Sequence, residues 1–150
     1  MGFTVILLAA SMTFWALHDG HGSAPQGDCA VIEQLGDEWA AMNKSITALS
    51  NGAGETKDLI AIADQESAMS SKIRAAESSV SAQTLKEQLI RWADGTALSA
   101  QVQRAAATSS SGQNGQTSTN STDADAVRAG MMTYSATAAL HQACPNLPVS

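Results

Sequence analysis

Two histidines and an aspartate lie close together near the start of the chain, at His18, Asp19 and His21. Imidazole nitrogens and carboxylate oxygens are ligands that suit Zn²⁺ or Cu²⁺. In a helical bundle the remaining histidine, His141, would lie at the same end of the molecule as this segment. A glycine-rich linker holds a metal poorly, however, because nothing fixes the orientation of its side chains. We therefore favour a linker that carries two histidines by chance, with His141 at a helix end, and predict no bound metal or other cofactor.

A carboxylate interrupts an otherwise apolar helical pattern at Glu66. It either marks a pocket or extends to solvent at the edge of the fold, and we favour the second interpretation because an unpaired buried carboxylate is costly. Met131 and Tyr134 are candidates for the wall of a cavity that holds a small apolar ligand, although methionine at helical spacing is more often ordinary core filling. The candidate ligand pocket therefore comprises Glu66, Met131 and Tyr134.

The sequence contains no recognisable set of catalytic residues. A catalytic triad needs a nucleophile, a histidine base and an orienting acid that converge in space, and no serine lies in a nucleophile-elbow context. Gly52 and Gly54 lack the preceding strand and the following lysine of a phosphate-binding loop. Asp37 and Glu38 fit a solvated helix face. We therefore expect a protein without enzymatic activity.

The charge distribution argues against polyanionic partners. The chain has 150 residues and a net charge of −6, and its eight lysines and arginines are scattered along it. Nucleic-acid backbones and anionic lipid headgroups are bound by clustered basic residues. We therefore expect no nucleic acid partner and no electrostatic binding to a lipid surface.

The N-terminal residues 1–17 predict the compartment. An uncharged apolar run extends from Phe3 to Leu17, which fits the apolar part of a signal segment and is shorter than the ~20 residues of an upright membrane span. No clean cleavage site follows, so we favour a retained membrane anchor over a cleaved signal; a buried helix of a cytosolic protein is a further alternative. The prediction is a membrane-anchored protein with its helical domain extracytoplasmic, or alternatively a secreted one.

The two cysteines support an oxidising compartment. Cys29 and Cys144 lie near the two ends of the helical region and have no CxxC or metal-site spacing. A lone pair at the ends of a domain is typical of a structural disulfide. We predict a bond between them.

Hydrophobic periodicity predicts helices throughout residues 29–144. The clearest pattern follows a polar linker at 18–28, where apolar residues recur in steps of three and four: Ile32, Leu35, Trp39, Met42, Ile46 and Leu49. This heptad pattern predicts an amphipathic helix with Trp39 buried. Residues 108–122 contain no large apolar side chain, which predicts a disordered loop, and residues 145–150 form a tail. No period-two alternation indicates a strand.

Local signals place the helix boundaries. Asp28 is a candidate N-cap of the first helix. Thr84 and Glu87 form a capping box at the start of the third helical segment. Gly95 and Thr96 interrupt the apolar stripe of that segment.

Four helical segments of similar length predict an all-α, up-down-up-down four-helix bundle. This topology brings the two cysteines together at the end nearest the membrane. In the alternative, a three-helix arrangement, the second and third segments merge into one long helix; the capping box and a preceding run of serines argue against it.

The combined features favour a non-enzymatic interaction or accessory module, tethered to the membrane and bound to another membrane or envelope protein. The alternative is a ligand-binding or sensory helical bundle that holds a small apolar ligand or a metal. A filled core with an exposed apolar stripe would favour the first, and a connected cavity would favour the second.

Overall fold

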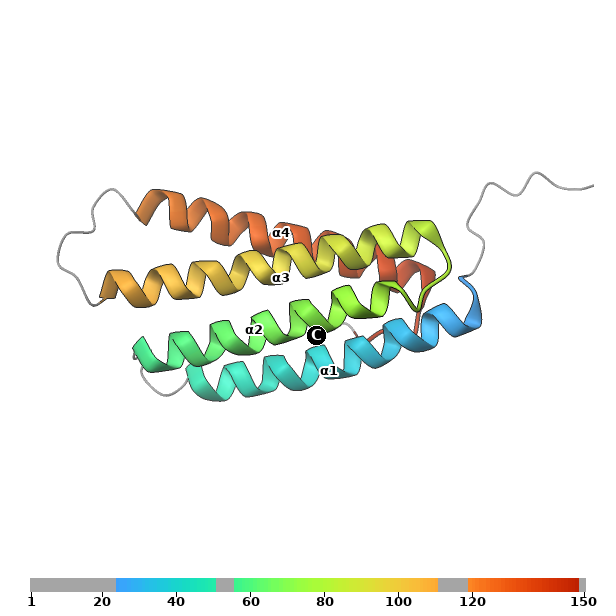
Figure 1. Ribbon diagram of the computed structural model, residues 1–150, viewed down its shortest axis with the longest axis horizontal. Helices are drawn as coiled ribbons and strands as arrows, with labels where there is room; N and C mark the ends of the chain where they lie inside the picture. The colour runs from blue at the N-terminus through green and yellow to red at the C-terminus, as the bar shows by residue number, and fades with distance from the viewer. Residues whose placement is uncertain (1–23, 51–55, 111–118, 149–150) are drawn as a thin grey trace, which may run out of the picture.

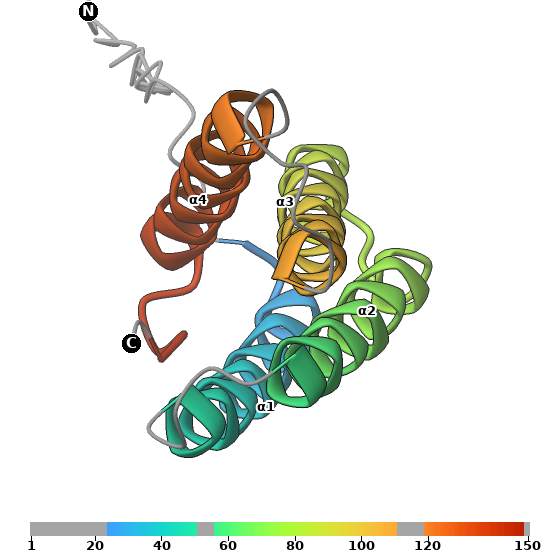
Figure 2. The same cartoon turned by 90° about the vertical axis from the view of Figure 1, so that its left-hand side faces the viewer.

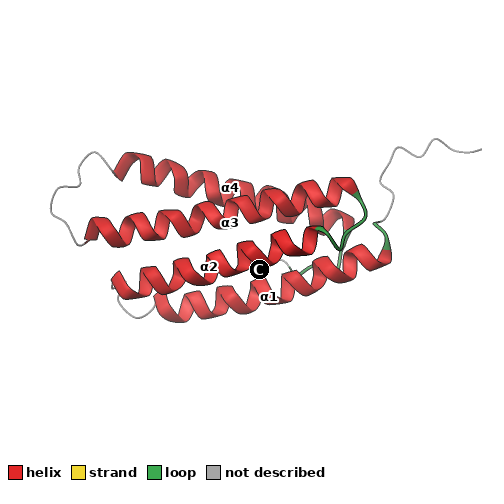
Figure 3. Ribbon diagram, in the orientation of Figure 1, coloured by secondary structure: helices red, strands yellow, loops and turns green. Residues whose placement is uncertain are grey.

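The computed structural model describes residues 24–50, 56–110 and 119–148. The candidate anchor at 1–17, with His18 and His21, lies outside these ranges. The described residues form only helices, turns and short irregular segments, with no strand (Figure 3). The four helices are α1 (Gln26–Ser50), α2 (Thr56–Glu77), α3 (Gln83–Ser110) and α4 (Thr119–Ala143). The all-α prediction is confirmed for this part of the chain, and none of these helices is long and apolar enough to cross a membrane.

Neighbouring helices run in opposite directions (Figure 1). The three-helix alternative is wrong, because α2 ends at Glu77, α3 begins at Gln83 and the chain reverses between them. Viewed along its length, the molecule is an open arc in which α1 packs on α2, α2 on α3 and α3 on α4 (Figure 2). Helices α1 and α4 are not closely packed against each other, so one side of the arrangement stays open.

The core changes character along the helices. At the end that holds the disulfide it contains large apolar side chains from all four helices and the C-terminal segment: Ile32, Leu35, Ile73, Leu85, Leu89, Trp92, Leu140 and Leu147. Towards the other end most of the buried apolar residues are alanines: Ala63, Ala100, Ala107 and Ala129. Small side chains let helix backbones approach closely, so α2, α3 and α4 pack tightly there although the chain has few aromatic residues.

At Gly95 helix α3 approaches α4 closely. A Cβ atom at this position would lie 2.6 Å from Thr133 Oγ1 and 2.9 Å from the Thr133 backbone nitrogen. The interruption predicted at Gly95 and Thr96 is therefore a helix contact, and α3 continues through it. Thr96 is buried, and its hydroxyl donates a hydrogen bond to the carbonyl oxygen of Trp92 at 2.9 Å.

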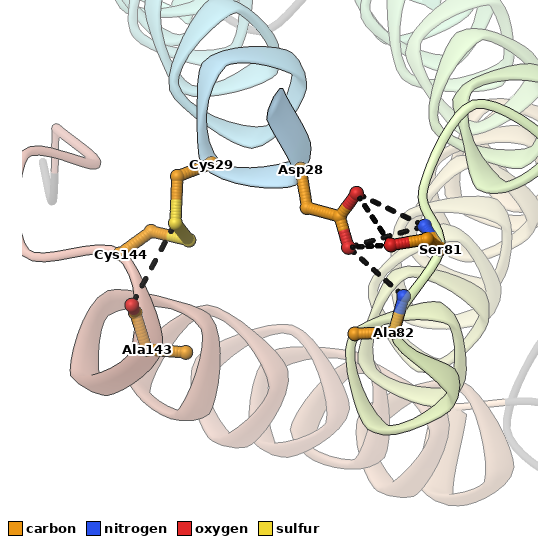
Figure 4. The surroundings of a disulfide bond; sticks show 6 residues. All are labelled: Asp28, Cys29, Ser81, Ala82, Ala143 and Cys144. Carbon is orange, nitrogen blue, oxygen red and sulfur yellow. Dashed lines mark hydrogen bonds between the residues drawn. A yellow bond between two sulfur atoms is a disulfide. The ribbon is translucent and has the colours of Figure 1, made fainter. Parts of the chain in front are cut away.

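The cysteines meet at one end of the molecule (Figure 4). Cys29 in the first turn of α1 is joined to Cys144, just after α4, with the two Cα atoms 5.3 Å apart. Cys144 is fully buried, and the Cys29 side chain lies beside the carbonyl oxygen of Ala143. The first and last described helices are thus covalently linked where they begin and end.

Asp28 caps a different helix from the one predicted (Figure 4). Helix α1 already begins at Gln26, and the buried Asp28 carboxylate accepts hydrogen bonds from the backbone nitrogens of Ser81 at 3.0 Å and Ala82 at 2.9 Å. These bonds from the α2–α3 turn, at the start of α3, lower the pKa of Asp28. Thr84 lies inside the first turn of α3, so the predicted capping box does not begin this helix.

Three predicted boundaries differ from the structure. Helix α1 includes the end of the linker predicted at 18–28. Helices α3 and α4 extend into the predicted loop 108–122 from both sides, and residues 111–118 lie outside the described residues. The predicted tail packs on the domain through Leu147 and Pro148. Leu147 is buried and, with Pro148, covers Gly36 of α1, where a Cβ atom would lie 2.5 Å from Leu147 Cδ1.

Candidate functional site

A groove runs along the open side between α1 and α4. It consists of two adjoining cavities that share Trp39 of α1 with Tyr134 and Thr137 of α4 as lining residues. The first, which we call the aromatic cavity, has a volume of about 350 Å³ and lies nearer the disulfide. The second, the carboxylate cavity, has a volume of about 330 Å³ and has Glu66 among its lining residues.

Two tryptophans pack together at the aromatic cavity. The ring centroids of Trp39 and Trp92 are 5.5 Å apart with an interplanar angle of 69°, the edge-to-face geometry that aromatic pairs favour. Trp92 is only 1% exposed, and its indole Nε1 is buried without a hydrogen-bond partner among the described residues. Trp39 is only partly buried, which corrects the prediction of a buried residue: α4 does not close over this face of α1.

Glu66 lies in the interior at the boundary of the carboxylate cavity, with 8% of its surface exposed. Its Oε1 accepts a hydrogen bond from the Ser99 hydroxyl at 2.7 Å, whereas its Oε2 is buried and has no partner in the described part of the chain. Burial raises the pKa of Glu66, opposed by the bond from Ser99 and by the positive charge of Arg104. The solvent-edge position favoured from the sequence is not the one observed.

The structure brings together two of the three predicted pocket residues. Tyr134 lines both cavities and Glu66 lines one, but Met131 does not line the groove. Met131 is 68% exposed on the outer surface of α4, one turn from Val127 at 65%. Together with the outer part of Tyr134, 77% exposed, these side chains form an apolar stripe on α4, called here the α4 stripe.

His141 makes a bond within the chain. It lines the aromatic cavity, and its Nδ1 lies 3.0 Å from the carbonyl oxygen of Leu147, to which it donates. Among the described residues no group of three histidine, cysteine or acidic side chains could hold a metal ion. The other two predicted ligands, His18 and His21, lie outside those residues.

Sequence reasoning missed the floor of the groove. Neither Trp92 nor Ser99 is among the candidate pocket residues predicted from the sequence. The signal was present in the spacing: Trp92, Thr96 and Ser99 follow one another in steps of four and three, which places them on one face of α3. When the inward-facing residues of a helix change from apolar to polar along its length, as these do, the helix is a candidate for lining a cavity.

No protein-family model, curated protein or solved structure matches this chain. A function is therefore inferred from the chemistry of the groove itself.

Proposed function

We propose that this protein is a non-enzymatic binding module that holds a small amphipathic ligand in the groove between α1 and α4. The observation that carries the proposal is Glu66, which lines a cavity and whose buried Oε2 has no hydrogen-bond partner among the described residues. Buried polar atoms in folded proteins almost always have a hydrogen-bond partner, since leaving one unpaired is costly. A ligand that supplies a donor at this point would offset that cost.

The shape of the groove supports the same proposal. Each cavity is of the size that small-molecule sites typically have, roughly 300–1,000 Å³. The aromatic cavity offers the rings of Trp39 and Trp92 with Ala138 and Leu147, which suit an apolar body. The carboxylate cavity offers a polar anchor. This combination of apolar walls with few polar groups is typical of binding sites.

The location belongs to the proposal as well. A disulfide between Cys29 and Cys144 favours an oxidising compartment. The apolar segment 1–17 would hold an up-down-up-down bundle outside the membrane, with the disulfide end nearest the bilayer, or would direct the protein to secretion if it is cleaved.

A second candidate function is an accessory module that binds a membrane or envelope protein. The α4 stripe favours it, because exposed apolar stripes on a soluble domain mark interaction surfaces. Its three side chains Val127, Met131 and Tyr134 recur in steps of four and three, so they form one face of a helix that a partner helix could cover.

One experiment separates the two candidates. The full chain is titrated with a neutral apolar fluorophore, N-phenyl-1-naphthylamine, and the affinity is compared with that of two variants. Thr137→Trp fills the junction of the two cavities and should abolish binding, whereas Met131→Glu disrupts the α4 stripe and should leave it unchanged. The opposite result would place the binding surface on the α4 stripe and overturn the groove proposal.

A further inference from the structure

We infer that the ligand of this groove is an organic cation, an amine whose ammonium group pairs with Glu66 and whose apolar body lies between Trp39 and Tyr134. This inference rests on the proposed function and specifies its ligand. It follows from the orientation of the carboxylate, from the charges around it and from the aromatic rings beside it.

One oxygen of the Glu66 carboxylate accepts a hydrogen bond, and the other is buried without a partner among the described residues. Ser99 donates to Oε1 at 2.7 Å, which fixes that side of the group. Oε2 remains an acceptor without a donor among the described residues. It is covered in the unliganded protein, so ligand binding includes a small turn of the Glu66 side chain into the cavity that it lines. A group with N–H or O–H bonds would satisfy this oxygen.

The charges favour a cation over a neutral donor. None of the described residues that line the carboxylate cavity is a lysine, arginine or histidine. Arg104 of α3 acts on Glu66 from a distance, but its guanidinium donates to Asp64 Oδ1 at 3.0 Å and to Ser67 Oγ at 2.9 Å. The negative charge of Glu66 therefore has no direct counter-ion within the described part of the chain, and an ammonium group would supply one.

The described residues that the other helices contribute to this cavity carry no competing charge. Helix α1 contributes Trp39, Asn43 and Ile46, and from α4 the only titratable lining residue is Tyr134. His141 of α4 lies in the adjoining aromatic cavity and is bonded to the carbonyl oxygen of Leu147. The net charge of −6 adds a general attraction for cations.

The aromatic rings complete a site for an amine. Trp39 and Tyr134 line the carboxylate cavity together with Glu66, and the same two residues line the aromatic cavity. Aromatic faces attract ammonium groups through the ring quadrupole, with tryptophan the strongest. A ligand with its ammonium group at Glu66 would thus extend its body past these rings towards Trp92 and Ala138.

The test compares three probes of similar shape and different charge on the full, oxidised chain. Binding of phenethylamine, 2-phenylethanol and 3-phenylpropionate is followed by tryptophan fluorescence and calorimetry. The amine should bind about 10- to 100-fold more tightly than the alcohol, as expected for a hydrogen bond to a charged group. The anion should bind most weakly, because Glu66 repels it.

The pH dependence gives an independent readout. Protonation of Glu66 removes the charge that the ammonium group needs, so amine affinity should fall as the pH decreases through the pKa of this residue. Burial raises that pKa, so the loss should begin above the range of an ordinary glutamate. The affinity for the alcohol should change little over the same range.

Glu66→Gln keeps the size of the side chain and removes its charge, and it should abolish the preference for the amine while the alcohol still binds. Glu87→Gln, an exposed position on α3, is the matched control and should behave as wild type. The comparison of amine with alcohol on the unmodified protein stands even if the first variant fails to fold. Equal affinity for amine and alcohol would overturn the cation inference but retain the groove; no binding of any probe, the neutral fluorophore included, would overturn both.

Discussion

Removal of the disulfide is the perturbation whose magnitude can be worked out most directly from the structure. Cys29 and Cys144 are 115 positions apart, so the bond closes a loop that contains nearly all of the described domain. On the chain-entropy model a loop of this length stabilises the folded state by about 4–5 kcal/mol, because it restricts the unfolded chain. This amount is a large fraction of the roughly 5–15 kcal/mol by which ordinary domains are stable.

The contacts of α1 determine which part of the structure becomes more mobile when the disulfide is removed. This helix packs on α2 and stands apart from α4 along the groove, so few contacts other than the disulfide connect the first helix with the last. Besides the disulfide, the Asp28 hydrogen bonds connect α1 to the α2–α3 turn, and the packing of Leu147 and Pro148 on Gly36 connects it to the segment after α4. The double variant Cys29→Ala/Cys144→Ala should therefore keep its helices, while α1 moves more freely against α4.

Urea denaturation followed by far-UV circular dichroism measures the effect. The double variant should lose about 4–5 kcal/mol in free energy of unfolding, with a nearly unchanged spectrum in the absence of urea. Chemical reduction of the wild type is the control for the substitutions and should give the same midpoint. A loss below about 1 kcal/mol would refute the reasoning, since it would show that the unfolded chain is not restricted by the bond as the entropy model requires.

Three further predictions concern single side chains. Asp28→Asn should destabilise the protein at neutral pH. Because hydrogen bonds from Ser81 and Ala82 lower the folded-state pKa of Asp28 below 3.8, its contribution is complete above that pH and decreases as the pH falls further, so the urea midpoints of wild type and variant should approach each other as the pH is lowered below 3.8. Gly95→Ala should lower the free energy of unfolding by about 1–3 kcal/mol, because the added methyl group would clash with Thr133. Gly130→Ala, whose methyl group would meet open space, should raise it by up to about 1 kcal/mol. Thermal denaturation of the two variants and the wild type measures the difference. Gly36→Ala should displace the C-terminal segment, detected as faster removal of its last residues by carboxypeptidase.

The parts of the fold that depend on periodicity could be predicted from the sequence. Steps of three and four placed Ile32, Leu35 and Met42 on the buried face of α1, as observed. The positions of Cys29 and Cys144 indicated which ends of the chain meet. The step pattern depends on one helix alone, and the cysteine positions depend only on where the helical region begins and ends. Neither prediction requires the distances between helices.

The groove could not be predicted in this way. Periodicity states which face of a helix is turned inwards, but it does not state whether the first and last helices close over that face. That outcome depends on the small residues at the α3–α4 contact, chiefly Gly95 and Ala129, which hold α4 close to α3. The position of Glu66 was predicted wrongly because a closed core would not hold an unpaired carboxylate, so the sequence favoured a position at the solvent edge.

The capping of α3 by Asp28 could not be predicted from the sequence either. Its partners Ser81 and Ala82 are more than fifty positions away in sequence. A capping pattern in the sequence finds only acceptors that lie next to their own helix. In this protein the acceptor for the start of α3 comes from the first turn of α1.

The disulfide also determines how the domain would transmit mechanical force. If the chain is pulled from both ends, the tension passes from the residues before Cys29 through the sulfur–sulfur bond to the residues after Cys144. The Cα atoms of the two cysteines are 5.3 Å apart. The residues between the two cysteines carry no tension, and they include α2, α3, α4 and all of α1 after its first turn. Stretching the oxidised protein should extend only the segments outside the two cysteines. Leu147, which lines the aromatic cavity, would be pulled away, whereas the carboxylate cavity should keep its shape under a force that would unravel the reduced protein.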